Sequence, residues 1–476
     1  MKLIFTLLLA TVSSLTLAQT IHPLQAMPAL PPVVDASASL PVPSGSLLPP
    51  LTFPPISAPA AAQPVPTALT LPAAPPIGTG DLWDRIRRGF AMPDLQDEFV
   101  TNREQWYATR PDYIARMTER SKKYLYHVVE ELEARKMPTE LALLPFIESA
   151  FNPQAVSSAK AAGMWQFIPS TGRDYSLKQN TFRDDRRDVQ ASTRAALDYL
   201  QKLYGMFGDW QLALAAYNWG EGSVGRAIAK NQRLGLPTTY SDLKMPNETR
   251  YYVPKLQAVK NIVSNPVQFN TLLDEIPNHP YFQSVPITRD MDVAIAAKMA
   301  QVPLADFKAL NPSLSRPVIL AAGTPQVLMP WGNAETFNTN LGEYKGALAS
   351  WTAWTAPSSM NPKDAAKRVG MSEASLREIN GIAMHKGLIK AGSTLLIPRS
   401  VHKMEDVTAQ VADNGQLTMF VPPPPPQKCK VRKAKNGRPI TSCAKSSKAA
   451  KATKTNAGKP LHKTTSSSKR KKHAQK

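Results

Sequence analysis

Between residues 81 and 270, apolar positions recur every three or four residues, which is the spacing of one face of an α-helix. The pattern is clearest over residues 111–136, where it comprises Ile114, Met117, Tyr124, Val128 and Leu132. Further helical stretches follow at residues 188–207, 209–220 and 248–263, and no strand-like alternation competes with them. We therefore predict an all-α domain over residues 81–270.

Another helical stretch in this domain is the segment MPTELALLPFIESA, residues 137–150. Thr139 stands where a side chain would cap the amino end of a helix. Glu140 follows in the first turn, where an acidic group interacts favourably with the helix dipole. We predict a helix in this segment with Thr139 as its N-cap.

The pattern changes behind this domain and becomes an internal repeat with an offset of 69 residues. Four residues recur at that offset: Ala296 and Ala365, Lys298 and Lys367, Asn311 and Asn380, Gly323 and Gly392. Each copy ends in a short apolar run and a proline. We predict two small α+β modules of the order strand, helix, helix, strand (βααβ), at residues 281–331 and 350–399.

The chain begins with one Lys, a short apolar run and small residues that end at Ala18. This order is typical of a secretory signal, which we place at residues 1–18. The apolar run is shorter than the roughly 20 residues that span a bilayer, although an uncleaved anchor stays an alternative. Residues 19–80 are rich in Pro and Ala, carry Asp35 as their only charge and are predicted to form an extended linker.

The positive charge of the chain is concentrated at its carboxyl end. The 57 Lys and Arg exceed the 36 Asp and Glu by 21, and residues 427–476 hold 17 of the basic residues and no acidic one. We predict that residues 420–476 form a disordered Pro-rich and then Lys-rich tail. Because export separates the protein from DNA, we expect no nucleic-acid partner. We expect the tail either to bind anionic envelope polymers or to serve only to keep the protein soluble.

Cys429 and Cys443 are the only cysteines, and they flank Asn436-Gly437, a dipeptide that suits a tight turn. A disulfide across this turn and two unpaired thiols both remain open. No Cys lies near the predicted signal cut, so lipid attachment is not expected. No metal-binding spacing of Cys or His occurs, and we predict neither a metal nor another cofactor.

The best candidate for chemistry is Glu148, the lone acid in LLPFIESAFNP, residues 143–153. Burial among apolar groups raises the pKa of a carboxyl, which then stays protonated near neutral pH and serves as a general acid. Ser149 follows directly and is placed to orient the carboxyl. The alternative is an ordinary surface glutamate on an amphipathic helix.

A second block, GMWQFIPSTG at residues 163–172, follows within a short loop. Gly163 permits a close backbone approach, either to a ligand or to another part of the chain. Gln166 needs hydrogen-bond partners if it is buried, and a sugar hydroxyl or acetamido group would serve. Trp165 and Phe167 offer flat faces for sugar rings, or they are core aromatics in a tight turn.

Two later blocks add polar groups. Tyr217 and Asn218, in AAYNWGEG, supply a hydroxyl and an amide, although Asn at a helix end is often only a cap. Tyr251 and Tyr252, in ETRYYVPK, are either substrate contacts or core tyrosines.

In this order and spacing, the blocks ESAFNP, GMWQFIPSTG, AAYNWGEG and ETRYYVPK resemble the lytic transglycosylase domain related to goose-type lysozyme. The resemblance extends over roughly residues 81–265 and implies a lysozyme-like fold. The two repeats resemble LysM modules, which bind N-acetylglucosamine-containing glycans. Each repeat lacks the usual Gly-Asp near its first turn, and the lipid-attachment Cys of membrane-bound family members is absent.

The resemblance implies that Glu148 is the sole acid/base and cleaves the bond between N-acetylmuramic acid and N-acetylglucosamine in peptidoglycan. The muramyl C6 hydroxyl would be the nucleophile, which leaves a 1,6-anhydro end. Ser149 would orient Glu148, and the substrate would be held by Gly163, Met164, Trp165, Gln166, Tyr217, Asn218 and Tyr252. The enzyme would act in the periplasm or cell envelope, and its oligomeric state stays open.

Two other classes of protein are consistent with these residues. A goose-type lysozyme would use water and a second carboxylate, for which the candidates are Asp174, Asp184, Asp185 and Asp188. The last three are interleaved with Arg186 and Arg187, which is more typical of ion pairs or a helix start. A non-catalytic glycan-binding envelope protein is the remaining alternative.

Overall fold

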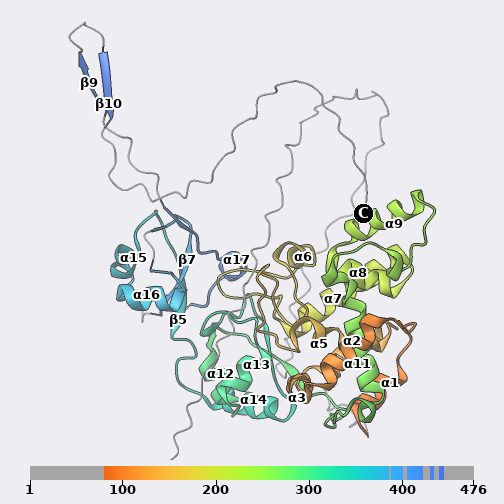
Figure 1. Ribbon diagram of the computed structural model, residues 1–476. Coiled ribbons are helices and arrows are strands. Elements are labelled where there is room, and N and C mark those ends of the chain that lie inside the picture. The colour runs from red at the N-terminus through yellow and green to blue at the C-terminus, as the bar shows by residue number, and fades with distance from the viewer. Residues whose placement is uncertain (1–79, 385–386, 400–404, 422–428, 434–438, 444–476) are drawn as a thin grey trace, which may run out of the picture. The chain divides into compact units, whose positions relative to one another are not determined.

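The computed structural model describes residues 80–384, 387–399, 405–421, 429–433 and 439–443 (Figure 1). The first domain consists of the helices α1 (Leu82–Arg88), α2 (Glu98–Ala108), α3 (Pro111–Ser121), α4 (Leu125–Ala134), η1 (Thr139–Leu143), α5 (Leu144–Ser149), α6 (Pro169–Asp174), α7 (Val189–Phe207), α8 (Trp210–Trp219), α9 (Glu221–Arg233), η2 (Tyr240–Asp242), α10 (Asn247–Arg250), α11 (Tyr252–Ser264) and η3 (Pro266–Phe269). The elements marked η are 3₁₀ helices. Residues 81–270, all described, contain isolated bridges but no strand, so the prediction of a helical domain is confirmed.

The segment predicted as one helix over residues 111–136 is two helices, α3 and α4. The hydroxyl of Ser121 donates to the carbonyl oxygen of Thr118 at 2.7 Å, and the backbone N–H of Tyr124 donates to the carbonyl oxygen of Ser121 at 2.8 Å. Such local bonds compete with the helical pattern and end α3. The apolar spacing continues across the break, which is why the sequence alone did not reveal it.

The predicted role of Thr139 as a helix cap is wrong, although the 3₁₀ helix η1 does begin at Thr139. Thr139 is buried inside η1, and its hydroxyl donates to the carbonyl oxygen of Ile86 at 2.6 Å instead of capping a helix. Glu140 is also buried, accepts the backbone N–H of Met92 at 2.8 Å and pairs with Lys260 at 3.1 Å. Both side chains therefore fix η1 to other parts of the domain, and α5 begins only at Leu144.

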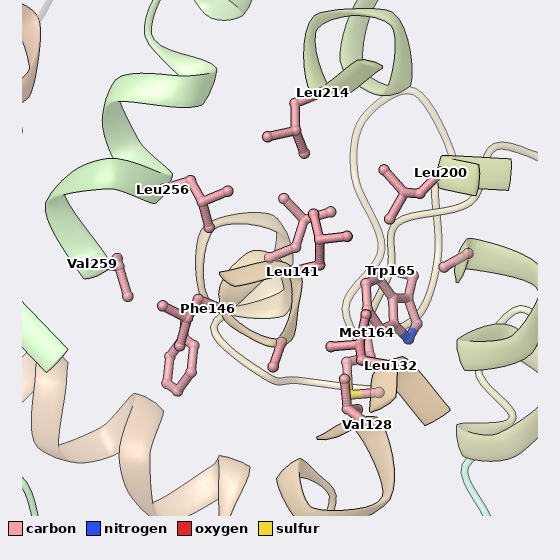
Figure 2. Close-up of a cluster of buried hydrophobic side chains, with 14 of the residues drawn as sticks. Val128, Leu132, Leu141, Phe146, Met164, Trp165, Leu200, Leu214, Leu256 and Val259 are labelled. Atoms are coloured by element: carbon pink, nitrogen blue, oxygen red, sulfur yellow. The ribbon is translucent and has the colours of Figure 1, made fainter. Parts of the chain in front are cut away.

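The core of the domain surrounds η1 and α5. Figure 2 shows Leu141 of η1 and Phe146 of α5 in one cluster with side chains from other helices, which include Val128, Leu132, Leu214 and Leu256. A helix of six residues, such as α5, is too short to be stable by itself in water. Tertiary packing holds α5 in place, and with it Glu148 near its carboxyl end.

The first repeat contains β1 (Phe282–Pro286), β2 (Met291–Asp292), α12 (Val293–Met299), α13 (Leu304–Leu310), β3 (Val318–Ile319) and β4 (Gln326–Pro330), with β1 antiparallel to β4. η4 (Trp331–Asn333) and α14 (Ala334–Glu343), which were not predicted, follow it. The second repeat contains β5 (Trp351–Thr355), α15 (Pro362–Arg368), α16 (Glu373–Asn380), β6 (Leu388–Ile389) and β7 (Thr394–Pro398), with β5 antiparallel to β7. The predicted order of strand, two helices and strand is confirmed in both.

The repeated asparagines have the same structural role. The side-chain amide of Asn311 donates to the carbonyl oxygen of Leu328 at 2.8 Å, and its own oxygen accepts the backbone N–H of Leu328 at 2.8 Å. Asn380 makes the same two bonds with Leu396, at 2.9 and 2.6 Å. In each module, one buried asparagine therefore joins the second helix to the last strand.

The remaining described elements are α17 (Ala409–Asn414), β8 (Met419–Phe420), β9 (Cys429–Lys433) and β10 (Pro439–Cys443). The antiparallel pair β9–β10 lies in the segment predicted to be disordered, so that prediction is wrong for these ten residues. Its register places Cys429 opposite Cys443, while the predicted turn at Asn436-Gly437 lies outside the described residues. The predicted signal at residues 1–18, the predicted linker apart from residue 80, and most of the basic tail lie outside the described residues.

Candidate active site

Glu148 lies at the wall of a cavity of about 540 Å³. After α5 the chain turns sharply, because Ala150 and Phe151 both adopt left-handed backbone conformations, with φ of 51° and 54°. Such conformations are uncommon for residues other than glycine and often mark functional sites. The turn ends α5 at Ser149, one residue after Glu148. No further turn of this helix follows, and Glu148 lines the cavity.

The surroundings of Glu148 favour its protonated form. Removal of the carboxyl from water raises its pKa to about 7. A hydrogen bond from the Tyr252 hydroxyl and the charge of Lys255 act in the opposite direction, and the charge of Glu248 raises the pKa further. A carboxyl that titrates near neutral pH is suited to both donating and accepting a proton.

Two tyrosines close the cavity around this carboxyl. Tyr252 is buried at the start of α11, and its hydroxyl donates to Oε1 of Glu148. The hydroxyl of Tyr217 donates to the carbonyl oxygen of Trp165 at 2.9 Å, which fixes the ring of Tyr217 against the loop that follows Glu148. Burial raises the pKa of both tyrosines well above their usual value, so both remain neutral donors.

Gln166 and Asn218 line the same cavity. The side-chain amide of Gln166 donates to the carbonyl oxygen of Gly163 at 2.7 Å, which holds the side chain in place. The side-chain oxygen of Asn218 accepts from the hydroxyl of Thr249 at 2.8 Å. Among the described residues the amide nitrogen of Asn218 has no hydrogen-bond partner, so it is available to a ligand.

Gly163, Met164 and Trp165, which were predicted as substrate contacts, do not line the cavity. Met164 and Trp165 are buried in the core, and the indole N–H of Trp165 donates to the Thr193 hydroxyl at 3.0 Å. Gly163 has a φ of +88°, and a side chain there would come within 1.9 Å of the carbonyl oxygen of Arg186. The backbone of Gly163 therefore lies close to another part of the chain, at Arg186. Phe167, in contrast, does line the cavity.

Ser149 makes a different contact from the predicted one. Its hydroxyl donates to the carbonyl oxygen of Met164 at 2.9 Å and accepts the backbone N–H of Asn152 at 3.2 Å. Among the described hydrogen bonds, none joins Ser149 to the carboxyl of Glu148. Ser149 connects the end of α5 to the loop that carries Gln166, and any influence on Glu148 is through the backbone.

Several cavity residues were not identified from the sequence, among them Tyr199, Trp219, Glu248 and Lys255. Glu248 and Lys255 stand at the two ends of ETRYYVPK, and their charges next to the two tyrosines were the available signal. Tyr199 lies inside α7, where nothing in the sequence distinguishes it from a core residue.

The aspartates considered as a second carboxylate do not line the cavity. Asp184 pairs with Arg186 at 2.7 Å, and Asp188 accepts the backbone N–H of Ala191 at the start of α7 at 2.8 Å. Asp185 accepts the backbone N–H of Lys178. The reading of Asp184, Asp185 and Asp188 as ion-pair and helix-start residues is therefore confirmed.

Three segments of the chain match models of known protein families. Residues 128–236 match the model of the transglycosylase SLT domain. Residues 281–346 match the LysM-like domain of the lytic transglycosylase MltD, and residues 366–398 match the LysM domain.

Individual relatives agree with these matches. Membrane-bound lytic murein transglycosylase D of Escherichia coli K12 is 36% identical over 357 residues, which cover 71% of this chain and 78% of the relative. A protein of Alteromonas sp. named for tributyltin chloride resistance is 37% identical over 169 residues, 35% of this chain and 80% of the relative. Membrane-bound lytic murein transglycosylase F of Yersinia enterocolitica is 34% identical over 126 residues, 24% of each chain.

A helical transglycosylase domain followed by LysM-type modules defines a lytic transglycosylase, an enzyme that acts on peptidoglycan. The chain belongs to the family of membrane-bound lytic murein transglycosylase D. In the part of the chain that the structure describes, no helix is long and apolar enough to span a membrane.

Proposed function

We propose that the enzyme cleaves the β-1,4 bond between N-acetylmuramic acid and N-acetylglucosamine and leaves a 1,6-anhydromuramyl end, with Glu148 as its single acid/base. The observation that carries the proposal is the position of Glu148 in the cavity, with its pKa raised by burial to about 7. One carboxyl with that pKa is protonated often enough to act as an acid and is basic enough to act afterwards as a base.

The proposed reaction has two proton transfers. Glu148 donates its proton to the glycosidic oxygen as the bond from this oxygen to C1 of the muramyl sugar breaks. The C6 hydroxyl of the same sugar then attacks C1, and the carboxylate of Glu148 accepts the proton of this hydroxyl. Glu148 is protonated again at the end, and no water is consumed.

Four further residues are proposed to hold the muramyl sugar and its acetamido group. Tyr252 donates to Oε1 of Glu148 and leaves Oε2 as the oxygen that carries the proton. The unpartnered amide nitrogen of Asn218 is suited to a carbonyl oxygen of the acetamido group. Tyr217 and Gln166 line the same cavity and are themselves fixed by backbone carbonyls.

The proposal is tested by mass spectrometry of peptidoglycan digested with the purified protein. Anhydro ends are lighter than reducing ends by one water, so the two products are separated directly. We expect anhydro ends with the wild type and no product with Glu148→Gln. Glu119→Gln, at an exposed position of α3, is the matched control and should retain full activity. Unchanged cleavage by Glu148→Gln would exclude the single acid/base.

Hydrolysis is the second candidate, and one observation favours it. Glu248 lines the cavity together with Glu148, so the site contains a second carboxylate that could activate water. This mechanism would be established if the wild type produces reducing ends and Glu248→Gln does not. Anhydro ends that persist in Glu248→Gln would exclude it.

The remaining segments are proposed to bring the enzyme to its substrate. We propose a signal at residues 1–18, a linker at 19–80, the catalytic domain at 81–270, modules at 281–331 and 350–399, and a tail at 420–476 that contacts anionic envelope polymers. Export to the periplasm or cell envelope fits the Lys, the apolar run and the small residues that end at Ala18. Loss of salt-sensitive envelope binding on deletion of residues 427–476 would support the role of the tail.

A further inference from the structure

A second cavity, of about 230 Å³, adjoins the cavity of Glu148. It is lined by Arg103, Trp106, Tyr107, Tyr113, Ile147 and Lys255. Ile147 and Lys255 also line the cavity of Glu148, so the two cavities share a wall. A substrate bound at Glu148 therefore has a second place to bind on the far side of these two residues.

The charge of the second cavity is positive. Arg103 and Lys255 line it, and none of the described acidic residues does. Among the described ion pairs, neither of these two cations has a carboxylate partner. The guanidinium of Arg103 donates through Nε to the neutral side chain of Asn102 at 3.1 Å and lies 5.1 Å from the ring centre of Tyr251. Two partly buried cations without carboxylate partners favour an anionic ligand.

The walls of the second cavity are aromatic and held in place by one another. The ring of Trp106 meets Tyr107 and Tyr113 edge to face, with centroid separations of 5.0 and 5.3 Å. Arg110 lies over the outer part of this cluster, 4.4 Å from the ring centre of Trp106. Such rigid apolar walls suit the aliphatic part of a ligand, while the cations suit its charge.

Most of this cavity lies outside the part of the chain that matches the transglycosylase domain model. Arg103, Trp106 and Tyr107 are on α2 and Tyr113 is on α3, whereas the match begins at residue 128. The cavity is therefore a feature that the helices preceding the matched domain add to the active site.

We propose that the second cavity binds a carboxylate of the peptide that peptidoglycan carries on its muramic-acid sugars. The inference rests on the proposed function, since a glycan strand at Glu148 is what brings such a peptide to the shared wall. The peptide has free carboxylates close to short aliphatic groups, which correspond to the cations and apolar rings of the cavity. The uncharged sugars of the strand would not need Arg103.

The test compares glycan strands that carry their peptides with the same strands from which an amidase has removed them. For the full-length protein, kcat/KM is measured from all new ends, anhydro and reducing together. We expect the wild type to prefer the peptide-bearing strands by about twofold to fivefold, the range of an ion pair that is partly exposed to solvent. Arg103→Gln should reduce this preference to near one, and Arg103→Lys should restore part of it.

Arg116→Gln is the matched control, because Arg116 is an exposed cation on α3 that does not line the cavity. It should leave both rates unchanged. The melting temperature of each variant is measured to exclude unfolding. Equal rates of the wild type on both strands, or an equal loss on both strands in Arg103→Gln, would overturn the inference and indicate a sugar site.

Failure of the proposed function is recognised separately. Reducing ends in place of anhydro ends would overturn the reaction proposed for Glu148 while the ratio of rates still tests the cavity. If no cleavage occurs, the same ratio is measured as Kd for both strands in a Glu148→Gln background. A Kd that does not depend on the peptide would again overturn the inference.

Discussion

The hydroxyl of Tyr252 donates a hydrogen bond to Oε1 of Glu148, although the two residues are 104 positions apart in the sequence. The bond is stronger when the carboxyl is charged, so it lowers the pKa of Glu148 and partly offsets the effect of burial. It also makes the two carboxyl oxygens unequal, because Oε1 accepts the hydrogen bond from Tyr252.

Tyr252→Phe removes this bond and should raise the pKa of Glu148 by about one to two units, because a hydrogen bond to a charged group contributes about 1.5–3 kcal/mol. The alkaline limb of the pH profile of kcat should move to higher pH, and kcat should fall because the carboxyl is no longer oriented. The profile of peptidoglycan cleavage between pH 5 and 9 measures both effects. An alkaline limb that stays in place would contradict the assignment of this limb to Glu148.

Glu248→Gln should have the opposite effect on the pH profile. The negative charge of Glu248 raises the pKa of Glu148, so its removal lowers this pKa and moves the alkaline limb to lower pH. Under the proposed mechanism the product remains anhydro-ended. Glu119→Gln, whose exposed carboxylate does not line the cavity, serves as the control and should not move the limb.

Glu148→Gln should stabilise the fold at pH 8 and have little effect at pH 4. The pKa of Glu148 is raised in the folded protein from 4.5 to about 7, so folding stability falls as the pH rises from about 4.5 to about 7 and stays lower above that, whereas at pH 4 the carboxyl is mostly neutral in both states. Partial exposure of the residue limits the gain to about 1–3 kcal/mol. Chemical denaturation at the two pH values measures it. An equal change at both would mean that the charge of Glu148 is not the cause.

Gly163→Ala should destabilise the domain by about 3 kcal/mol or more. Its φ of +88° is unfavourable for alanine, and the added carbon would overlap the carbonyl oxygen of Arg186. Gly208→Ala is the control, because Gly208 has a φ of +66° but no atom within 4 Å of the added carbon, and it should cost only about 1 kcal/mol. Equal losses in urea denaturation would show that backbone strain alone matters at Gly163.

Trp165→Phe should lower stability without changing the KM for glycan. The substitution removes the donor to Thr193 and part of a fully buried side chain, at a cost of about 1–3 kcal/mol. Because Trp165 does not line the cavity, the KM measured at a temperature where the variant is folded should equal that of the wild type. A raised KM would restore the prediction that Trp165 contacts the sugar.

The sequence was informative where one residue type has one physical reason to be present. A lone glutamate among apolar residues indicated a raised pKa, and the structure agrees. Matched asparagines indicated a repeat, and both make the same pair of bonds. At other positions, tertiary contacts determined the role of the residue. Thr139 had the sequence context of a cap but bonds to Ile86, and Trp165 had the context of a sugar platform but packs in the core.

The charged residues of the cavity were harder to predict for a different reason. Glu248 is exposed, and Lys255 lies on α11 with a spacing that is equally typical of a solvated face. Only the fold brings these residues to Glu148, since α10 and α11 follow α5 by about a hundred residues. Charge alone does not distinguish a cavity residue from any other surface residue.

The raised pKa of Glu148 has a physiological consequence. Under the proposed mechanism, the fraction of enzyme molecules that hold the required proton is about one half near pH 7 and about nine tenths one pH unit lower. Acidification of the compartment would therefore accelerate cutting of the wall without any activator protein. Under this mechanism, the position of one carboxyl among apolar side chains would make the rate of wall turnover depend on local acidity.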